Sequence, residues 1–254
     1  MGRATTRTLE RVAAAVGMLD GAPIEFELVK DVPDGGVLFA LPALLLNGLL
    51  SKSRQIFSMP EGFYPLESIF LVLALMALGR IPSLEALRYV APGEWGKLIG
   101  LDRIPEVRTL RQKLSALCSE QGRAERWSSL LAKQWMAAEP QSAGVFYADG
   151  HVRIYHGKLT DLPRRYVARE RLCLRGTTDY WLNAMDGRPF LVVPCAVDPG
   201  LLSVLEHHIV PRLKADVPGQ PSDQELEADP LRSRFSIVFD REGYSPKFFA
   251  RMKT

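Results

Sequence analysis

Residues 145–157 have the sequence VFYADGHVRIYHG, and this stretch decides how the second half of the chain folds. Every second side chain is small or apolar, whereas the side chains between them are mostly polar. A period of two is typical of a β-strand that buries one face. The small or apolar positions are Phe146, Ala148, Gly150, Val152 and Ile154.

Asp149 lies in the middle of this pattern and allows two interpretations. Asp is disfavoured in strands, and Asp-Gly often forms the turn of a hairpin. A turn at Asp149-Gly150 would leave strand arms of only about four residues, and it would interrupt a period that continues through both residues. The unbroken period favours one strand with Asp149 on its polar face, where a functional site would explain the carboxylate.

The composition is that of a globular protein. The chain has 254 residues, 47% of them hydrophobic, and a formal net charge of +3. This length suits one large or two medium domains, and the charge permits nucleic-acid binding. The odd number and wide spacing of the cysteines suit no zinc site, so we expect reduced, partly buried thiols in a cytoplasmic protein. They are Cys118, Cys173 and Cys195.

Two apolar runs occupy residues 37–50 and 68–79, and the N-terminus lacks the apolar core of a signal peptide. Both runs are shorter than the roughly 20 residues that cross a bilayer. We expect them to form buried helices or a strand-helix core, with no membrane partner.

Residues 1–143 are predicted to form a helical, possible DNA-binding region. An apolar helix is expected over 66–78, and Ser83 is placed to cap a short helix that Ala91-Pro92-Gly93 ends. A later helix is expected over about 122–138.

A basic helix is expected just after Pro105. One face has apolar residues at helical spacing, namely Val107, Leu110, Leu114 and Leu117. Three cations lie elsewhere on its surface: Arg108, Arg111 and Lys113. Two interpretations stay open. The helices form a helix-turn-helix reader whose cations contact DNA, or they form an ordinary helical subdomain with a solvated charged face.

A basic connector, residues 158–175, follows the first strand. Its arginines either contact phosphate or belong to a solvated loop: Arg164, Arg165, Arg169, Arg171 and Arg175. Two strands are expected next, over 177–186 and 188–197, with a hairpin turn at Asp186-Gly187.

The remaining elements are a helix, a loop, a strand and a helix. Asp198 is placed to cap a helix over about 199–215, which Pro211 should kink or end early. A polar loop over about 216–232 precedes a short strand at 235–240. Ser245 is placed to cap the last helix.

This order of elements is that of a ribonuclease H-like fold, in which the first and fourth predicted strands lie side by side. Asp149 and Asp240 would then meet, unless they are two unrelated aspartates at strand ends. Close carboxylates repel each other, and a divalent cation such as Mg²⁺ removes that repulsion. Two ions about 4 Å apart can hold the attacking and leaving oxygens of a phosphodiester.

Three blocks carry a family resemblance: FYADGHVRIYHG, LPRRYVARERLCLRGTTDYWLNAMDGRPFLVV and IVFDREGYSPKFF. They resemble bacterial insertion-sequence transposases of the DDE type. FYPLESIFLVLALMALGRIPS and GLDRIPEVRTLRQKL resemble the N-terminal region of the same family. The resemblance implies a ribonuclease H-like core that cuts transposon ends and joins them to target DNA, using Mg²⁺ or Mn²⁺.

By this resemblance Asp149 matches the first acidic residue of the family and Asp240 the second. The third, a Glu, lies on a later helix in such enzymes, and the sequence ends at Thr254 before it. Glu242 belongs to the wrong element to replace it. We therefore expect the front portion of a transposase, with residues 144–254 as a partial, C-terminally truncated catalytic domain.

Several other residues have two interpretations each. His151 either touches phosphate or a metal-bound water, or is a polar residue on an open sheet face. Tyr180 and Trp181 are expected in sheet packing, with a flipped base as the alternative. Asp179 is a weaker candidate neighbour of Asp149, and His207-His208 are expected to face solvent.

Three functions follow from these patterns. The first is a transposase that cleaves and joins DNA. The second is a DNA-binding fragment that does not cut, acting on transposon ends or pairing with itself or with the full-length enzyme. The third is a host nuclease of the same fold. The expected partner is double-stranded DNA, at transposon ends and in target DNA, and we expect a nucleoid-associated bacterial protein.

Overall fold

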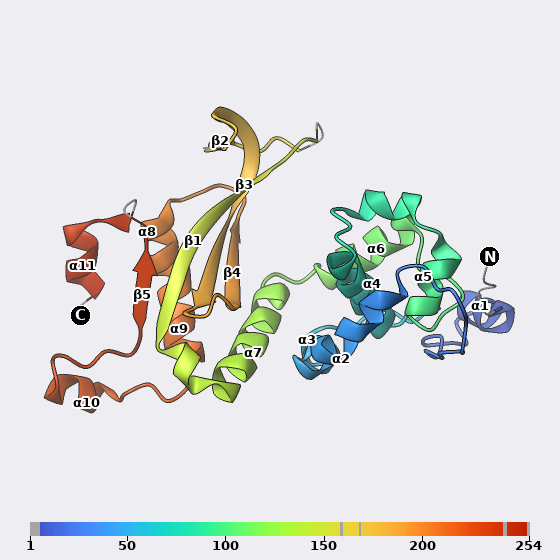
Figure 1. The fold of residues 1–254 in the computed structure, drawn as a ribbon, viewed down its shortest axis with the longest axis horizontal. Coiled ribbons are helices and arrows are strands. Elements are labelled where there is room, and N and C mark those ends of the chain that lie inside the picture. The colour runs from blue at the N-terminus through green and yellow to red at the C-terminus, as the bar shows by residue number, and fades with distance from the viewer. Residues whose placement is uncertain (1–5, 158–159, 168, 241–242, 253–254) are drawn as a thin grey trace. The chain divides into compact units, whose positions relative to one another are not determined.

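The computed structural model describes residues 6–157, 160–167, 169–240 and 243–252. It divides into two compact units, Met1–Trp127 and Ser128–Thr254, each of which is described by itself (Figure 1). The division falls within helix α7 (Arg123–Ala138). The sequence analysis instead places the boundary between the helical region and the strand-containing region at residues 143–144, because the first strand begins there.

The first unit is helical, as the sequence predicts, and α4 has the expected bounds. α4 and α6 form much of its core, in which Ile69, Val72 and Leu110 are fully buried. The apolar face of α6 is confirmed, because Val107, Leu110 and Leu117 are buried. The helices are α1 (Thr8–Ala15), α2 (Leu41–Leu46), α3 (Leu49–Ile56), α4 (Leu66–Leu78), α5 (Pro92–Leu98) and α6 (Val107–Leu117), with 3₁₀ turns at Gly35–Ala40 and Leu84–Tyr89.

The prediction that the apolar run 37–50 is buried is wrong. No residue of α2 is buried, and Phe39 and Leu46 are largely exposed. Asn47-Gly48 divides the run, because Gly48 has a left-handed backbone (φ 96°) that ends one helix before the next begins. The resulting short helices each bury only part of their surface.

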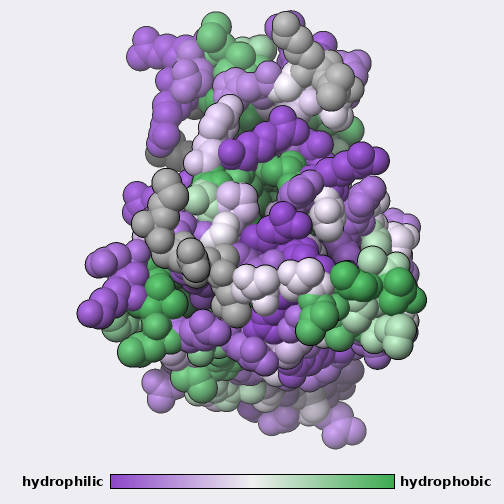
Figure 2. Space-filling view, turned by 90° about the vertical axis from the view of Figure 1, so that its right-hand side faces the viewer, coloured by the Kyte–Doolittle hydropathy of each residue, from purple (hydrophilic) through white to green (hydrophobic). Residues whose placement is uncertain are grey.

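Exposed apolar side chains also occur along α1 and at its C-cap, where Leu9, Val12 and Val16 are largely exposed. Figure 2 looks onto the side of the molecule that carries α1, and its hydrophobic patches are separated by hydrophilic side chains. Among the described residues no single helix is long and apolar enough to span a bilayer, although the bent pair Gly35–Leu46 and Leu49–Ile56 passes the same test.

The second unit contains a mixed, open β-sheet. Its order is β2-β3-β1-β5, and β4 pairs with β3. β1 is antiparallel to β3 and parallel to β5, so the first and fourth predicted strands are neighbours as expected. The strands are β1 (Val145–Ile154), β2 (Arg164–Val167), β3 (Leu172–Ala184), β4 (Pro189–Cys195) and β5 (Ser236–Phe239).

Asp149 and Gly150 lie within β1, so the alternative of a hairpin turn there is wrong. They pair with Trp181 and Tyr180 of β3. A Cβ atom on Gly150 would lie 3.0 Å from Cε1 of Tyr180, which is tighter than ordinary contact. Glycine at this position therefore leaves room for the tyrosine ring. The turn at Asp186-Gly187, by contrast, is confirmed, with Gly187 left-handed at φ 86°.

The basic connector is more ordered than the sequence predicts. Arg164–Val167 forms β2, which pairs with the start of β3 as a hairpin. β3 accordingly begins at Leu172, before the expected residue 177. Clustered arginines suggested a loop, but their aliphatic stems are compatible with an exposed ribbon.

The helix expected at 199–215 is present with one correction at its start. It consists of α8 (Leu201–Val204), a π-helical turn (Leu205–Ile209) and α9 (Val210–Asp216). Gly200, not Asp198, occupies the N-cap position. Pro211 does not end the helix, which continues to Asp216. The helix is irregular just before Pro211, where the π turn lies. His207 and His208 face solvent, as expected.

Two further elements complete this unit. The predicted loop at 216–232 contains helix α10 (Asp223–Ala228), which begins with a capping box between Ser222 and Glu225. Serine followed three residues later by glutamate is a known start signal that the sequence analysis missed. The last helix, α11 (Pro246–Met252), begins where expected, and the Phe248 amide donates to Ser245 Oγ at 3.3 Å.

Helices pack against one face of the sheet. Phe146 and Ala148 of β1 share a core with Met136 of α7 and with Leu205 and Leu213 of the helix before β5 (Figure 1). Because side chains alternate along a strand, Tyr147 and Asp149 point to the other face.

Asp198 connects the sheet to the start of α8. Its carboxylate accepts hydrogen bonds from Tyr180 Oη at 2.6 Å, from the Gly200 amide at 2.8 Å and from Thr178 Oγ1 at 3.3 Å. Burial opposes ionisation, but these bonds and the charge of Arg165 hold the pKa of Asp198 below its usual value. Burial and Asp198 together raise the pKa of Tyr180.

Tyr180→Phe should therefore lower the free energy of unfolding by about 1.5–3 kcal/mol at pH 7, because it removes a hydrogen bond to a charged acceptor. Tyr166→Phe, on the exposed strand β2, is the matched control and should change little. Urea unfolding measures both. Because the pKa of Asp198 is depressed, the stability that its ionised form contributes is present above the ordinary pKa of about 3.9 and is lost as the pH falls further. If the wild type and Tyr180→Phe still differed as much in free energy of unfolding well below that pH, this assignment would be contradicted.

Candidate metal centre

Asp149 lies on the face of the sheet opposite the helices. It is exposed, and its partner across the antiparallel ladder is Trp181 of β3. The next pair on this face is His151 with Asp179, and the previous pair is Tyr147 with Asn183. The polar positions that the sequence pattern assigned to one face of β1 therefore lie beside a polar stretch of β3.

Asp240 comes directly after β5, at the point where the pairing with β1 ends. The last two register pairs are Tyr147 with Val238 and Ala148 with Phe239. Asp149 is the next residue along β1 and Asp240 is the first residue after β5, and both are exposed. Alternation places them on the face of Tyr147 and Val238, and adjacent strands lie about 4.8 Å apart. The register thus puts the two carboxylates on the same face of the sheet, one within β1 and one directly after its neighbour β5.

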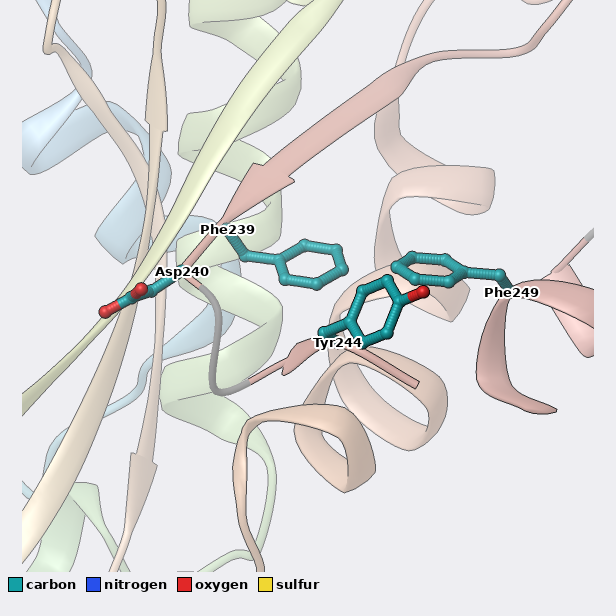
Figure 3. Close-up of a pocket in the computed structure, with 4 residues that line it drawn as sticks. All are labelled: Phe239, Asp240, Tyr244 and Phe249. Atoms are coloured by element: carbon teal, nitrogen blue, oxygen red, sulfur yellow. The ribbon is translucent and has the colours of Figure 1, made fainter. Parts of the chain in front are cut away.

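Figure 3 shows how the Asp240 side chain leaves the end of β5. Its carboxylate points away from the rings of Phe239, Tyr244 and Phe249, which gather on the other side of the strand. Phe239 faces the partly buried side and Asp240 the exposed side, in keeping with the alternation along β5.

Asp179 lies on the same face as Asp149 but is buried and already paired. Its Oδ2 lies 3.3 Å from Arg153 Nη1 of β1. Its position therefore suits a structural ion pair better than an exposed metal ligand. Glu242 lies outside the described residues. Within residues 6–157, 160–167, 169–240 and 243–252, no group of three or more metal-ligating side chains is present.

Tyr180 and Trp181 do not share the role that the sequence suggested for both. Tyr180 is buried in sheet packing, as expected, whereas Trp181 is 37% exposed on the face of Asp149. Strand alternation at 180–181 could have separated the two residues, since neighbours in a strand point to opposite faces. Trp181, Tyr147 and Val238 give the surface around the two carboxylates a partly apolar character.

The donor set of Asp149 and Asp240 fits a hard divalent cation. Carboxylate oxygens are the ligands that Mg²⁺ prefers, and Mg²⁺ binds through one or two carboxylates while it keeps several waters. The exposure of both side chains leaves space for those waters. Two like charges close together repel each other, and a divalent cation between them would remove that repulsion.

The hairpin of β2 and β3 carries a concentration of positive charge. Arg164 lies directly across from Arg175, and Arg169 and Arg171 are exposed at the turn. Like charges that face each other across a ladder are destabilising, and the Asp161 carboxylate, 3.2 Å from Arg175 Nη2, offsets only part of this charge. An anion bound along the hairpin would offset the rest.

Arg165 differs from the other connector arginines. Its Nε and Nη2 atoms are buried, and among the described residues they have no hydrogen-bond partner. It points to the face of Leu174, its partner on β3, and its charge helps to lower the pKa of Asp198. Arg165 therefore suits an internal electrostatic role better than contact with an external phosphate.

The basic surface of α6 is partly engaged within the first unit. Arg111 forms an ion pair with Glu85, and Lys113 Nζ donates to the Pro60 carbonyl at 3.1 Å. Burial also lowers the pKa of Lys113. Arg108 is exposed. Of the three cations predicted on this helix, Arg108 is the best placed to meet an external anion.

Comparisons with known proteins give one result. A family model described as "Transposase protein" matches residues 2–254, nearly the whole chain. Searches of curated proteins and of solved structures found no match.

Asp149→Asn should raise the melting temperature by about 1–4 °C in EDTA at low salt, because it removes one of two neighbouring like charges. Differential scanning calorimetry of the wild type and the variant measures the change. The gain should shrink in 1 M NaCl, where the Debye length is about 3 Å. Equal melting temperatures at low salt would show that the two carboxylates do not repel each other.

Proposed function

This chain belongs to the transposase family whose model matches it, and from that membership we propose that it carries the first two acidic residues of a DDE-type catalytic centre. Transposases act on DNA. Asp149 and Asp240 are the proposed catalytic and metal-binding residues. The observation that carries the proposal is their shared register, one step beyond the Ala148–Phe239 pair on a single exposed face.

The topology of the second unit supports a ribonuclease H-like arrangement. Three antiparallel strands, β4, β3 and β1, are followed by a crossover helix and by β5 parallel to β1. Parallel neighbours need such a crossover, and it brings residues 149 and 240 together although they are far apart in sequence.

Asp149 and Asp240 would hold Mg²⁺ or Mn²⁺ through their carboxylate oxygens. When bound, the ion supplies positive charge that stabilises the developing negative charge on a phosphodiester. The chain's own contribution is to hold Asp149 within β1 and Asp240 directly after its parallel neighbour β5. A strand positions a site more closely than a loop does.

The hairpin arginines support DNA as the partner. A duplex carries one negative charge per about 1.7 Å of its axis, and the exposed guanidinium groups of Arg164, Arg169, Arg171 and Arg175 lie along one ribbon. Such contacts hold the DNA backbone without reading its sequence. Sequence preference is proposed to lie in the helical first unit, where Arg108 is exposed on α6.

A second candidate function is DNA binding without cleavage. The described residues bring two carboxylates to this face, whereas the transposases that the chain resembles use three acidic residues. The two candidates share the basic hairpin and differ in whether the phosphodiester is cut.

The double variant Arg164→Gln/Arg175→Gln should weaken DNA binding on the order of 10-fold at 100 mM salt. It should also reduce the slope of log affinity against log salt by about 1.8, since each lost phosphate contact removes about 0.9. Gel shifts at several salt concentrations measure both values. Arg123→Gln/Arg126→Gln removes the same charge from α7, where both residues pair with Glu120, and serves as the control. An equal effect of the control would mean that net charge, not the hairpin, governs binding.

Asp149→Asn and Asp240→Asn should each weaken Mn²⁺ binding at least 10-fold, because an amide lacks the charge that holds a divalent cation; even outer-shell changes have effects of about 10–100-fold. Calorimetric titration with Mn²⁺ measures the loss, with Asp186→Asn as the control. DNA affinity in EDTA should stay within about twofold of the wild type.

The same samples, incubated with DNA and Mg²⁺ and run on a denaturing gel, separate the two candidate functions. Nicking by the wild type that disappears in both variants supports the enzyme. Intact DNA together with salt-dependent binding supports the second candidate. Normal Mn²⁺ binding in either variant would remove that residue from the proposed centre.

A further inference from the structure

An open hollow lies in the first unit, where the N-terminal end of α1 meets the segment that precedes α6. Its volume is about 420 Å³, within the range of about 300–1,000 Å³ that small-molecule sites occupy. Arginines outnumber acidic residues in its lining, so its chemistry suits an anion. The lining consists of Thr6, Arg7, Thr8, Arg11, Gly93, Asp102 and Arg103.

Arg11 is held rigidly at the wall of this hollow. Its Nε and Nη2 atoms donate to the Asp102 carboxylate at 2.7 and 2.6 Å, and Nη2 also donates to Tyr64 Oη at 3.3 Å. Its guanidinium carbon lies 3.9 Å from the centroid of the Phe63 ring. These contacts leave the donors on Nη1 without a partner among the described residues. A guanidinium that is already fixed loses little freedom when it binds a further acceptor.

Arg7 brings a second unused donor. Its side chain is only 2% exposed, and its Nη atoms lie against the Glu10 and Glu25 carboxylates and the Gly100 carbonyl. The Nε–H group of Arg7 is buried, and within the described ranges it has no hydrogen-bond partner. A buried donor without a partner is unfavourable. An acceptor bound in the hollow would remove this cost.

The start of α1 adds backbone donors. The first amides of a helix have no partner within it, and here the ladder starts with the bond from the Arg11 amide to the Arg7 carbonyl. Arg7 occupies the N-cap position, and an arginine side chain has no acceptor that could cap those amides. Because residues 6–8 line the hollow, the positive end of the helix dipole lies beside it. Such a helix end favours a bound anion.

Arg103 supplies a cation outside the existing ion pairs. It is exposed, and the ion pairs of the described part of the chain do not include it. Its neighbour Asp102, the acid of the lining, is already engaged by Arg11. The two glutamates that pair with Arg7 lie outside the lining. The hollow therefore combines an available guanidinium group with an uncapped helix start.

We propose that this hollow binds a phosphate group. Its oxygens would accept from Arg103, from Arg11 Nη1 and from the start of α1 at the same time, and hydrogen bonds between charged groups are the strong ones. A carboxylate has only two oxygens and would satisfy fewer of these donors. The proposal concerns the first unit alone and does not depend on the metal pair of the second unit.

Two sources of phosphate share this chemistry, namely the DNA backbone and a free phosphate ion. A backbone phosphate held at α1 would fix the duplex against the first unit without reading its bases. A free phosphate would stabilise the first unit on its own. The experiment has one arm for phosphate itself and one arm for DNA.

The first arm compares melting temperatures in sodium phosphate and in sodium chloride of equal ionic strength and pH. Phosphate also stabilises proteins by exclusion from their surface, so the quantity that decides is the difference between variants. The wild type should gain about 2–4 °C more from phosphate than Arg103→Gln does, because a bound ligand stabilises the folded state. Arg103→Lys keeps the charge but not the planar fork, and it should retain more of this gain than Arg103→Gln.

Arg80→Gln is the matched control, because Arg80 is an exposed arginine of the first unit outside the hollow. It should gain as much from phosphate as the wild type does. Equal gains in the wild type and in Arg103→Gln would overturn the proposal. The same loss in Arg80→Gln as in Arg103→Gln would also overturn it, since net charge and not the hollow would then govern the effect.

The second arm measures gel shifts of DNA in EDTA at several salt concentrations. If a DNA phosphate occupies the hollow, Arg103→Gln should lower the slope of log affinity against log salt by about 0.9. An unchanged slope, together with the lost gain in phosphate, would assign the hollow to a free phosphate. A folded chain that binds no DNA would contradict the proposed function, whereas the melting temperatures would still decide this inference.

Discussion

The parallel pairing of β1 with β5 is the constraint on which the candidate site depends. It consists of only four register pairs, from Val145–Ser236 to Ala148–Phe239, yet it fixes which face each following side chain occupies. Phe146, packed edge-on against Phe190 and Phe235, holds β1 to the core at this point. Because the buried face is set by these aromatics, a slip of one residue in β5 would bury Asp240 and expose Phe239. Hydrophobic packing on one face thereby specifies the position of charge on the other.

Charges of opposite sign are concentrated at two places in the second unit. Asp149 lies within β1 and Asp240 directly after the adjacent strand β5, and Arg164 and Arg175 face each other on the hairpin. A cation would bind at the first place and a polyanion at the second, and DNA accompanied by a divalent ion provides the two together.

Much of this arrangement could be predicted from the sequence because it rests on periodicity. The alternation through residues 145–154 identified β1 even with an aspartate and a glycine inside it, and the apolar run 66–78 gave the bounds of α4. The remainder depends on tertiary partners. The β2 segment contains two arginines among four residues and becomes a strand only because β3 extends to meet it. Trp181 is exposed beside Asp149 because of the strand register. The aromatic pocket behind Asp240 forms because α11 lies next to β5. Neither the register nor the place of α11 can be read from a local sequence pattern.

The π-helical turn at Leu205–Ile209 has a consequence for how the chain tolerates insertions and deletions. A π turn accommodates one more residue than the α-helical spacing and re-aims everything after it. Leu205 and Ile209 at the two ends of the turn and Leu213 after it are all fully buried against the sheet. Deleting one residue within the turn would remove the extra residue that it accommodates, so that regular α-helical spacing resumes with Leu213 still on the buried side. Deleting one residue from α8 or α9 themselves would instead rotate the following residues by about 100°. The π turn is therefore the place in this helix where the loss of a residue is best tolerated.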